Sequence, residues 1–216
     1  RSTRTISSSA SDVYKRQSVY YMPNCVDKSL EKLKIYNNHY FKSDVFFAMS
    51  HGVHRGVLKK GKIDARERLI RKLIDITPNV KFDCYGLGGN QPIWSDDFLH
   101  SLSQNKIGLN LSQGKSSNFY SSDRLSQLIG NGLMVMIDEK TKIGSFFQKD
   151  EIVTYNTLSV LSEKIIKYSY DNKKRKEIAK KGRDKYFKYF NSKEIADFII
   201  NKTFSKNKKY YWEKFI

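Results

Sequence analysis

The sequence predicts an α/β domain in which a parallel β-sheet is covered by helices on both faces. Three observations carry this prediction: short apolar runs recur along the chain, segments with helical spacing separate them, and polar or glycine-rich loops follow them. Strands that are apolar on both sides are typical of parallel sheets buried between helices. The 216 residues suffice for one domain with a substantial core and an appendage.

Five apolar runs are the expected strands, and they lie at residues 45–49, 80–84, 107–111, 133–137 and 152–155. Helical spacing occurs at residues 69–74, 98–102 and 125–129. The first of these helices is stopped by Pro78 and the last closes on Gly-Asn-Gly. With right-handed crossovers between the strands, this order is a Rossmann-like fold.

Four polar loops follow the first four strands, at residues 51–56 (HGVHRG), 85–90 (YGLGGN), 112–122 and 138–141 (DEKT). Ligands of parallel sheets bind at the carboxyl ends of the strands. We therefore expect these loops to converge on one edge of the sheet and to form a binding site there.

The loop after the first strand carries three cations near two glycines, namely Arg55, Lys59 and Lys60. Glycine lets the backbone approach a ligand, and the cations would face a diphosphate. Ordinary surface charge is the competing explanation. The loop matches neither the Walker pattern nor GxGxxG. His51 and His54 lie beside Gly52 but lack a third ligand nearby, so we expect no metal.

Residues 118–138 contain the most informative loop, in which Ser121, Ser122 and Asp123 precede a short helix. These residue types are preferred helix caps, and the positive end of a helix binds phosphate through backbone N–H groups. Arg124 adds a fixed cation with a forked set of donors. We expect these four residues to hold a phosphate or sugar hydroxyls.

The formal net charge is +18, and about +10 of it lies in residues 163–216, which contain 17 Lys and Arg but only 7 Asp and Glu. A solvated, lysine-rich helical face explains this charge most simply. The alternatives are a nucleic-acid-binding module, and an anionic membrane surface bound through the lysine-rich end of the chain, where we expect the aromatic residues Tyr210, Tyr211, Trp212 and Phe215 to be exposed. No nucleic-acid-binding motif is present, and neither alternative explains the loops, so we do not expect nucleic acid as a partner.

Two cysteines, Cys25 and Cys84, make neither a disulfide framework nor a metal site, which indicates a reducing compartment. No window approaches the ~18 apolar residues of a membrane span. We expect a cytoplasmic location, with association at the inner face of the membrane as an alternative. Residues 1–17 are rich in Ser, Thr and Arg, and we expect a disordered or non-native tail there.

The order of the motifs resembles the carboxy-terminal half of GT-B glycosyltransferases, in the group-one branch that includes spore-coat-type relatives. The matching residues are Arg55, Lys60 and Gly61 after the first strand, Gly86 and Gly88 after the second, and Arg124, Gln127 and Gly132 before the fourth. Residues 22–27 (MPNCVD) and 172–191 extend the resemblance to the interdomain segment and to the helix after the last strand.

The resemblance implies that this half binds a nucleotide-diphosphate sugar while an amino-terminal domain binds the acceptor. Arg55 and Lys60 would be the catalytic residues, offsetting charge on the leaving diphosphate without metal or cofactor. The implied substrate-binding residues are His51, Gly52, Lys59, Gly86, Gly88, Asn90, Ser121, Ser122, Asp123, Arg124 and Gln127. The resemblance further implies a bacterial enzyme that transfers a hexose and serves polysaccharide synthesis at the cell surface.

Two departures from the family pattern concern the ribose and sugar contacts. Gln127 stands where the family usually has a glutamate, although its amide oxygen still accepts a hydrogen bond, and an exposed helix residue is the competing explanation. Phe119 occupies the position of the family's earlier glutamate.

The expected organisation is an interdomain remnant at 18–40, a sugar-nucleotide domain at 41–192 and a helix at 193–216 directed at an absent acceptor domain. We therefore expect the chain alone to be an inactive fragment.

Overall fold

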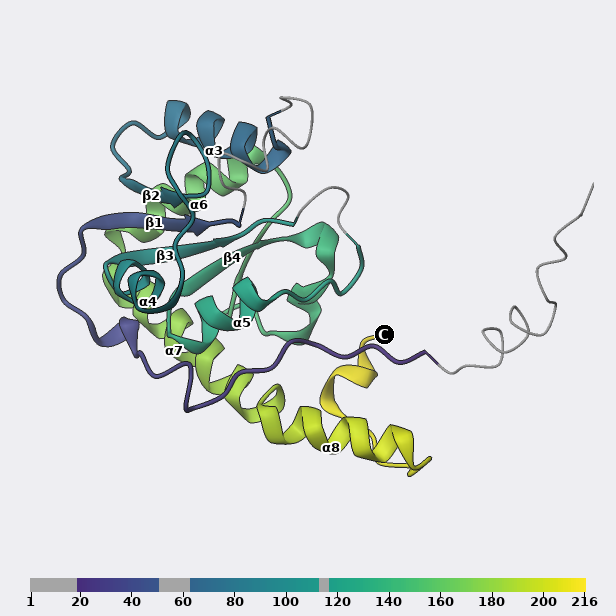
Figure 1. The fold of residues 1–216 in the computed structure, drawn as a ribbon. Helices are drawn as coiled ribbons and strands as arrows, with labels where there is room; N and C mark the ends of the chain where they lie inside the picture. The colour runs from purple at the N-terminus through teal and green to yellow at the C-terminus, as the bar shows by residue number, and fades with distance from the viewer. Residues whose placement is uncertain (1–18, 51–62, 113–116) are drawn as a thin grey trace, which may run out of the picture.

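The computed structural model describes residues 19–50, 63–112 and 117–216. Five strands form one sheet in the order β2-β1-β3-β4-β5, and all neighbouring strands run parallel (Figure 1). The strands are β1 (Ser43–Ala48), β2 (Phe82–Tyr85), β3 (Asn105–Asn110), β4 (Met134–Asp138) and β5 (Val153–Tyr155). Each coincides with an apolar run of the sequence, so the predicted Rossmann-like α/β fold is confirmed.

Helices cover both faces of the sheet. The α-helices are α3 (Ala65–Ile76), α4 (Ser95–Ser103), α5 (Asp123–Gly130), α6 (Leu158–Tyr170), α7 (Asn172–Tyr189) and α8 (Ser192–Thr203). Short 3-10 helices are η1 (Ile35–Asn37), η2 (Glu139–Thr141), η3 (Ile143–Phe146) and η4 (Tyr211–Lys214). In Figure 1, α3 and α6 lie on one side of the strands, and α4, α5 and α7 lie on the other.

Alternation along the strands divides the core into two apolar clusters. In β1, Val45 and Phe47 join the cluster that contains Ile70 of α3, whereas Phe46 joins the cluster that contains Leu102 of α4. All five side chains are fully buried. Because successive strand residues point to opposite faces, a continuous apolar run is what a sheet covered on both sides requires.

The strand order creates a switch point between β1 and β3. From β1 the chain passes through α3 to β2 on one side, and it then returns through α4 to β3 on the other side of β1. The connection that leaves β1 thus leads toward β2, whereas the connection that leaves the adjacent β3 leads through α5 to β4, in the opposite direction. A crevice opens at the carboxyl ends of such strands, and this position favours ligand binding.

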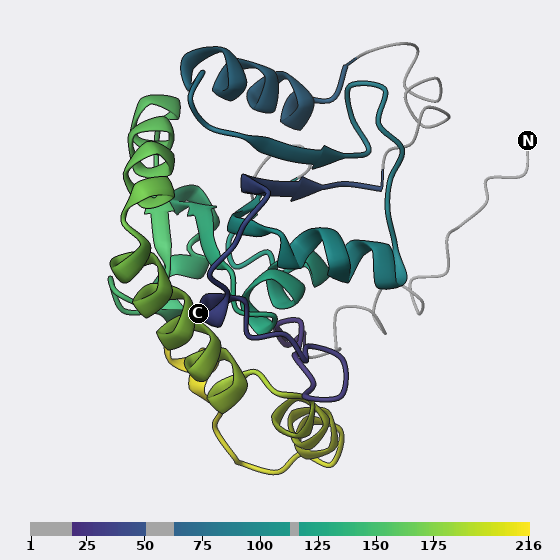
Figure 2. The same ribbon diagram turned by 90° about the vertical axis from the view of Figure 1, so that its left-hand side faces the viewer.

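The segment that precedes β1 packs along α7 and the start of α8, as Figures 1 and 2 both show. Val26 is fully buried and exchanges backbone hydrogen bonds with this junction: its N–H donates to Phe190 O at 3.0 Å, and its carbonyl accepts from Ser192 N at 2.9 Å. Val26, within the segment that resembles the family's interdomain connection, is thus part of this domain's core.

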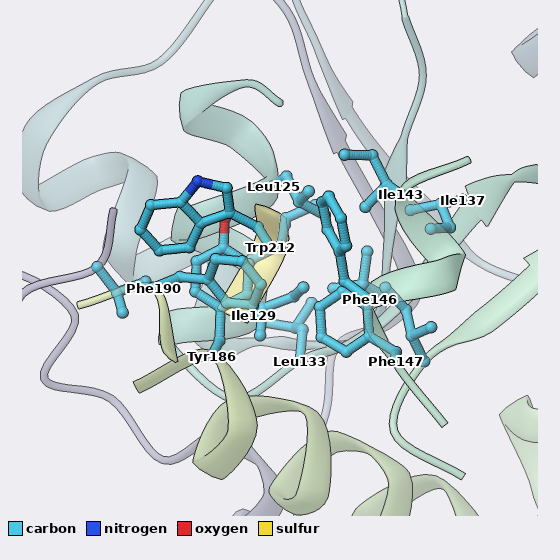
Figure 3. Packing of buried hydrophobic residues seen from close by; sticks show 14 of the residues in the cluster. Leu125, Ile129, Leu133, Ile137, Ile143, Phe146, Phe147, Tyr186, Phe190 and Trp212 are labelled. Atoms are coloured by element: carbon cyan, nitrogen blue, oxygen red, sulfur yellow. The ribbon is translucent and has the colours of Figure 1, made fainter. Parts of the chain in front are cut away.

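The aromatic residues near the end of the chain correct one expectation. We expected Tyr210, Tyr211, Trp212 and Phe215 to be exposed, but Tyr210 and Trp212 are only 3% and 0% exposed. Trp212 stacks on Phe190 with the ring centroids 5.9 Å apart (Figure 3). The chain after α8 folds back as η4, so these rings fill this domain's own core. Phe215, at 37% exposed, is the one closest to the expectation.

Many lysines of the basic α7 face carboxylates. Lys180 lies 2.6 Å from Asp184, and Lys181 lies 2.6 Å from Asp150. Lys185 bonds to Glu151, also at 2.6 Å. This pairing favours the interpretation of α7 as a solvated helical face. None of the helices in the ranges covered by the structure has the length and hydropathy needed to cross a bilayer.

Candidate functional site: a cleft at the sheet's switch point

A cleft of about 640 Å³ opens at the carboxyl ends of β1 and β3. We call it the switch-point cleft. Its walls come from the end of β1, the loop between β2 and α4, the start of α3, the start of α5 and the segment before η1. The lining residues are Leu30, Glu31, Ala48, Met49, Ser50, Arg66, Pro92, Ile93, Trp94, Ser95, Asp96, Phe98, Leu99, Leu111, Tyr120, Ser122, Asp123, Arg124, Gln127 and Asn131.

Arg124, in the first turn of α5, joins the two strands at the switch point. Its Nε donates to Ala48 O at 2.9 Å, and its Nη1 donates to Leu111 O at 2.8 Å. Its guanidinium carbon also lies 5.1 Å from the centroid of the Phe47 ring. Burial, and then the nearby charge of Arg66, lower the pKa of Arg124 to about 10, so the group stays protonated at neutral pH. Arg124 therefore shapes the cleft and carries charge into it.

The start of α5 presents backbone donors to the cleft. The carbonyl of Ser122 accepts from Leu125 N at 2.9 Å and from Ser126 N at 3.3 Å. The N–H groups of Asp123 and Arg124 have no acceptor among the residues that the structure describes. Although Ser122 is the N-cap residue, its hydroxyl makes no capping bond and lies 3.3 Å from Asn110 Oδ1. This helix end can accept an anion, as the residue types predicted.

Asn24 holds the start of α5 in place from the segment before β1. Its N–H donates to Ser121 Oγ at 3.0 Å, and its side-chain amide donates to the carboxylate of Asp123. Its carbonyl accepts from Tyr186 Oη at 2.8 Å. Three groups of one asparagine thus connect the MPNCVD segment, α5 and α7. Ser121 takes part in this anchor and is not among the residues that line the cleft.

A second arginine, Arg66, lines the cleft from the start of α3. The carboxylate of Asp64 caps α3 by accepting from Arg66 N at 2.8 Å. The same carboxylate receives Arg66 Nε at 3.0 Å and Nη2 at 3.1 Å. Asp64 therefore orients the Arg66 guanidinium and offsets its charge, and Arg66 lies near enough to Arg124 to influence the pKa of Arg124.

An aromatic ring and an amide also line the cleft. Trp94, between β2 and α4, lines the cleft with 63% of its surface exposed. Gln127 lines the cleft one turn along α5, and its side chain makes no hydrogen bond to any other described residue. The cleft therefore combines cations, backbone donors, an amide and a stacking surface.

The residues predicted from the first loop lie outside the described residues. They are His51, Gly52, Arg55, Lys59 and Lys60. Of the five predicted residues at the start of α5, the structure brings four to the cleft, Ser122, Asp123, Arg124 and Gln127.

The predicted residues of the glycine-rich turn do not line the described cleft. Gly86 and Gly88 adopt φ values of 77° and 61°, which favour glycine. Asn90 donates its side-chain amide to Cys84 O at 3.0 Å, which closes the turn. The turn thus shapes the loop, and the cleft is lined by the residues that follow it, from Pro92 onward.

The comparison with known protein families decides what the chain is. Residues 65–201, more than half of the chain, match the glycosyl transferase-like family. The chain belongs to this family. The sequence has no match among curated proteins.

Several solved structures are similar to this glycosyl transferase-like chain. TarM superposes with a TM-score of 0.54 at 13% identity, over 89% of this chain and 41% of TarM. A point mutant of S. aureus TarM, in complex with fondaparinux, alpha-GlcNAc-glycerol and UDP, gives 0.54 and 13% over 88% and 41%. Sucrose-phosphate synthase from Thermosynechococcus elongatus gives 0.48 and 13% over 88% and 54%.

The likeness to TarM shows the fold, a domain like the carboxy-terminal half of GT-B glycosyltransferases. The resemblance noted from the order of motifs is thereby confirmed. The chain spans about two fifths of the length of TarM.

Sequence reasoning missed three residues at the site, Asn24, Arg66 and Trp94. Each had a usable signal: an asparagine in the interdomain motif, an arginine two residues after a helix-capping aspartate, and a tryptophan in a loop after a strand. None of these signals is specific without the fold.

Proposed function

We propose that this glycosyl transferase-like chain binds a nucleotide-diphosphate sugar in the switch-point cleft and serves as the donor half of a glycosyltransferase. The observation that carries the proposal is the position of the cleft. It lies at the switch point of the sheet. There, two arginines, Arg66 and Arg124, meet the first backbone N–H groups of α5, which have no acceptor in the described part of the chain. Family membership makes a donor nucleotide the natural ligand for this combination.

The diphosphate belongs at the start of α5, because backbone donors and arginines favour its charge. In this proposal Gln127 forms a hydrogen bond to a ribose hydroxyl, since its amide both donates and accepts. We propose Arg55 and Lys60 as the catalytic cations. They would stabilise the charge that develops on the diphosphate as the bond between it and the sugar breaks. An acceptor oxygen forms the new bond to the sugar carbon and gives up its proton, and the nucleoside diphosphate leaves with the electron pair.

The acceptor belongs to a second domain in this proposal, in keeping with the share of TarM that the chain spans. Transfer of a hexose to a cell-surface glycan or a lipid-linked saccharide is the reaction we propose for the complete enzyme. The described chain supplies the donor cleft and, through Asn24, the connection from that cleft to the segment before β1.

Thermal unfolding with added nucleotides tests the donor site. The chain is heated with UDP, GDP or ADP at about 100 times the dissociation constant, which should stabilise it by about 2.7 kcal/mol. For a domain of this size, that corresponds to a rise of roughly 5–10 °C in Tm. Arg55→Ala and Lys60→Ala should each reduce the rise. Lys72→Ala, on the exposed face of α3, is the matched control and should not.

The absence of a Tm rise with all three nucleotides would overturn the proposal. Binding to RNA with a steep dependence on salt, and without any effect of nucleotide, would instead favour a nucleic-acid-binding module. Binding to anionic vesicles alone would favour a membrane-associated module.

A further inference from the structure

The aromatic wall of the switch-point cleft ends in a carboxylate. Trp94 is the N-cap residue of α4, and its carbonyl accepts from Phe98 N at 3.2 Å. Ser95, between Trp94 and Asp96, adopts a φ of 54°, which is uncommon for a residue other than glycine. The backbone therefore turns at Ser95, and both Trp94 and Asp96 line the cleft. A stacking surface and an acceptor thus stand two residues apart.

Asp96 differs from the other carboxylates in the cleft. Glu31 Oε2 accepts from Asp27 N at 2.7 Å, and Asp123 accepts from the side chain of Asn24. Both therefore have partners within the protein. Asp96 is exposed and makes no hydrogen bond or ion pair within the described ranges 19–50, 63–112 and 117–216. Its acceptor capacity is available to a ligand.

A carboxylate is an unusual lining for a cleft that takes a diphosphate, because like charges repel. It is favourable only where the ligand presents hydrogen-bond donors, since an ionised carboxylate accepts and does not donate. In a nucleotide the candidates are the sugar hydroxyls and the edge of the base. Bases stack on aromatic rings, so the base is the part of a nucleotide that would bind against Trp94 and therefore close to Asp96.

The bases differ in what they offer a carboxylate. Guanine presents two adjacent donors, N1–H and the N2 amino group, which match the two carboxylate oxygens. Uracil presents one N–H between two carbonyl oxygens, and these oxygens repel a carboxylate. Adenine presents an amino group beside an acceptor nitrogen. Guanine alone among the three pairs both carboxylate oxygens with donors.

We propose that Trp94 and Asp96 form a guanine-selective base site, so that the donor of this chain is a GDP-sugar. The proposal rests on the proposed function, since it places a nucleotide in the same cleft. In it, Trp94 stacks on the purine and Asp96 accepts from N1–H and the N2 amino group. Asp96 is a specificity-determining residue that contacts the base and takes no part in the bond-breaking step.

Isothermal titration of the full chain with GDP, UDP and ADP tests this proposal. GDP should bind at least about 10-fold more tightly than UDP or ADP, because a bidentate pair discriminates between bases by about that factor or more. Asp96→Asn should weaken GDP about 10-fold and leave UDP and ADP within about 3-fold. Asp97→Asn is the matched control, since Asp97 shares the first turn of α4 and is exposed but does not line the cleft.

The wall itself is tested with Trp94→Leu, which removes a largely exposed ring and should leave the fold unchanged. It should weaken GDP by at least about 5-fold through lost stacking. UDP or ADP binding as tightly as GDP would overturn the guanine proposal and leave the donor site standing. Equal effects of Asp96→Asn and Asp97→Asn would also overturn it. Failure of all three nucleotides to bind would overturn both proposals.

Discussion

Replacement of Arg124 tests whether this side chain holds the switch point together. Arg124 donates to Ala48 O at 2.9 Å and to Leu111 O at 2.8 Å, so one residue of α5 connects the ends of β1 and β3. A hydrogen bond from a charged donor contributes about 1.5–3 kcal/mol, and a buried carbonyl left without a partner costs a similar amount. Arg124→Met loses both bonds and should lower the free energy of unfolding by about 3–6 kcal/mol. Arg124→Lys, whose single ammonium replaces a forked donor, should lose about 2–3 kcal/mol.

Urea unfolding followed by circular dichroism measures these changes. Arg71→Met is the matched control, because Arg71 is exposed on α3 and, among the described residues, pairs only with Glu67 across one helical turn, at 2.7 Å. It should cost less than about 1 kcal/mol. If Arg124→Met cost no more than Arg71→Met, the reasoning that Arg124 fastens the two strands would be refuted. Any loss of nucleotide binding in Arg124→Met should then be measured at a temperature where the variant is fully folded.

Three further predictions concern packing and pH. Gly182→Ala should lower the free energy of unfolding, measured in urea, by about 1–3 kcal/mol, because the added Cβ would lie 2.2 Å from Glu151 O. This cost exceeds the gain from the better helix propensity of alanine. A stabilised variant would contradict this close approach. Trp212→Ala should cost about 3–5 kcal/mol, and Phe215→Ala, at a partly exposed ring, less than half as much by the same measurement. Hydrogen bonds from Ser192 and Ser29 lower the pKa of Asp27 from 3.8 to about 2. The ionised Asp27 therefore contributes fully to stability above about pH 4, and this contribution is lost as the pH falls toward 2. Between pH 6 and pH 2, the urea midpoint of Asp27→Asn should therefore fall less steeply than that of the unaltered chain.

The proposed donor binding to the cleft would have a structural consequence for the rest of a GT-B enzyme. Asn24 fixes Ser121 and Asp123 at the start of α5, and it lies in the segment that resembles the interdomain connection. A ligand at the start of α5 would therefore be separated from the segment before β1 only by Ser121 and Asp123, which Asn24 contacts directly. The geometry connects the donor site with that segment through direct hydrogen bonds.

The fold, and the location of the cleft at the carboxyl ends of the strands, could be predicted from the sequence because their causes are local. Five apolar runs coincide with five strands, since a strand buried on both faces needs apolar residues in succession. The helix after Ser122 was predicted from its capping residues and from the glycine of Gly132, whose φ of 84° closes the turn into β4.

What only the tertiary structure decided depends on distant segments meeting. Arg66 and Trp94 line the cleft because the order β2-β1-β3 brings the starts of α3 and α4 to the same end of the sheet. Arg124 was predicted to hold phosphate, yet its bonds to Ala48 and Leu111 depend on where β1 and β3 end. Tyr and Trp are typical of a membrane-surface anchor, but the chain folds back after α8 and buries Tyr210 and Trp212. Apolar patterning determines which residues avoid water, whereas the partner against which each one packs is determined by contacts between residues far apart in the chain.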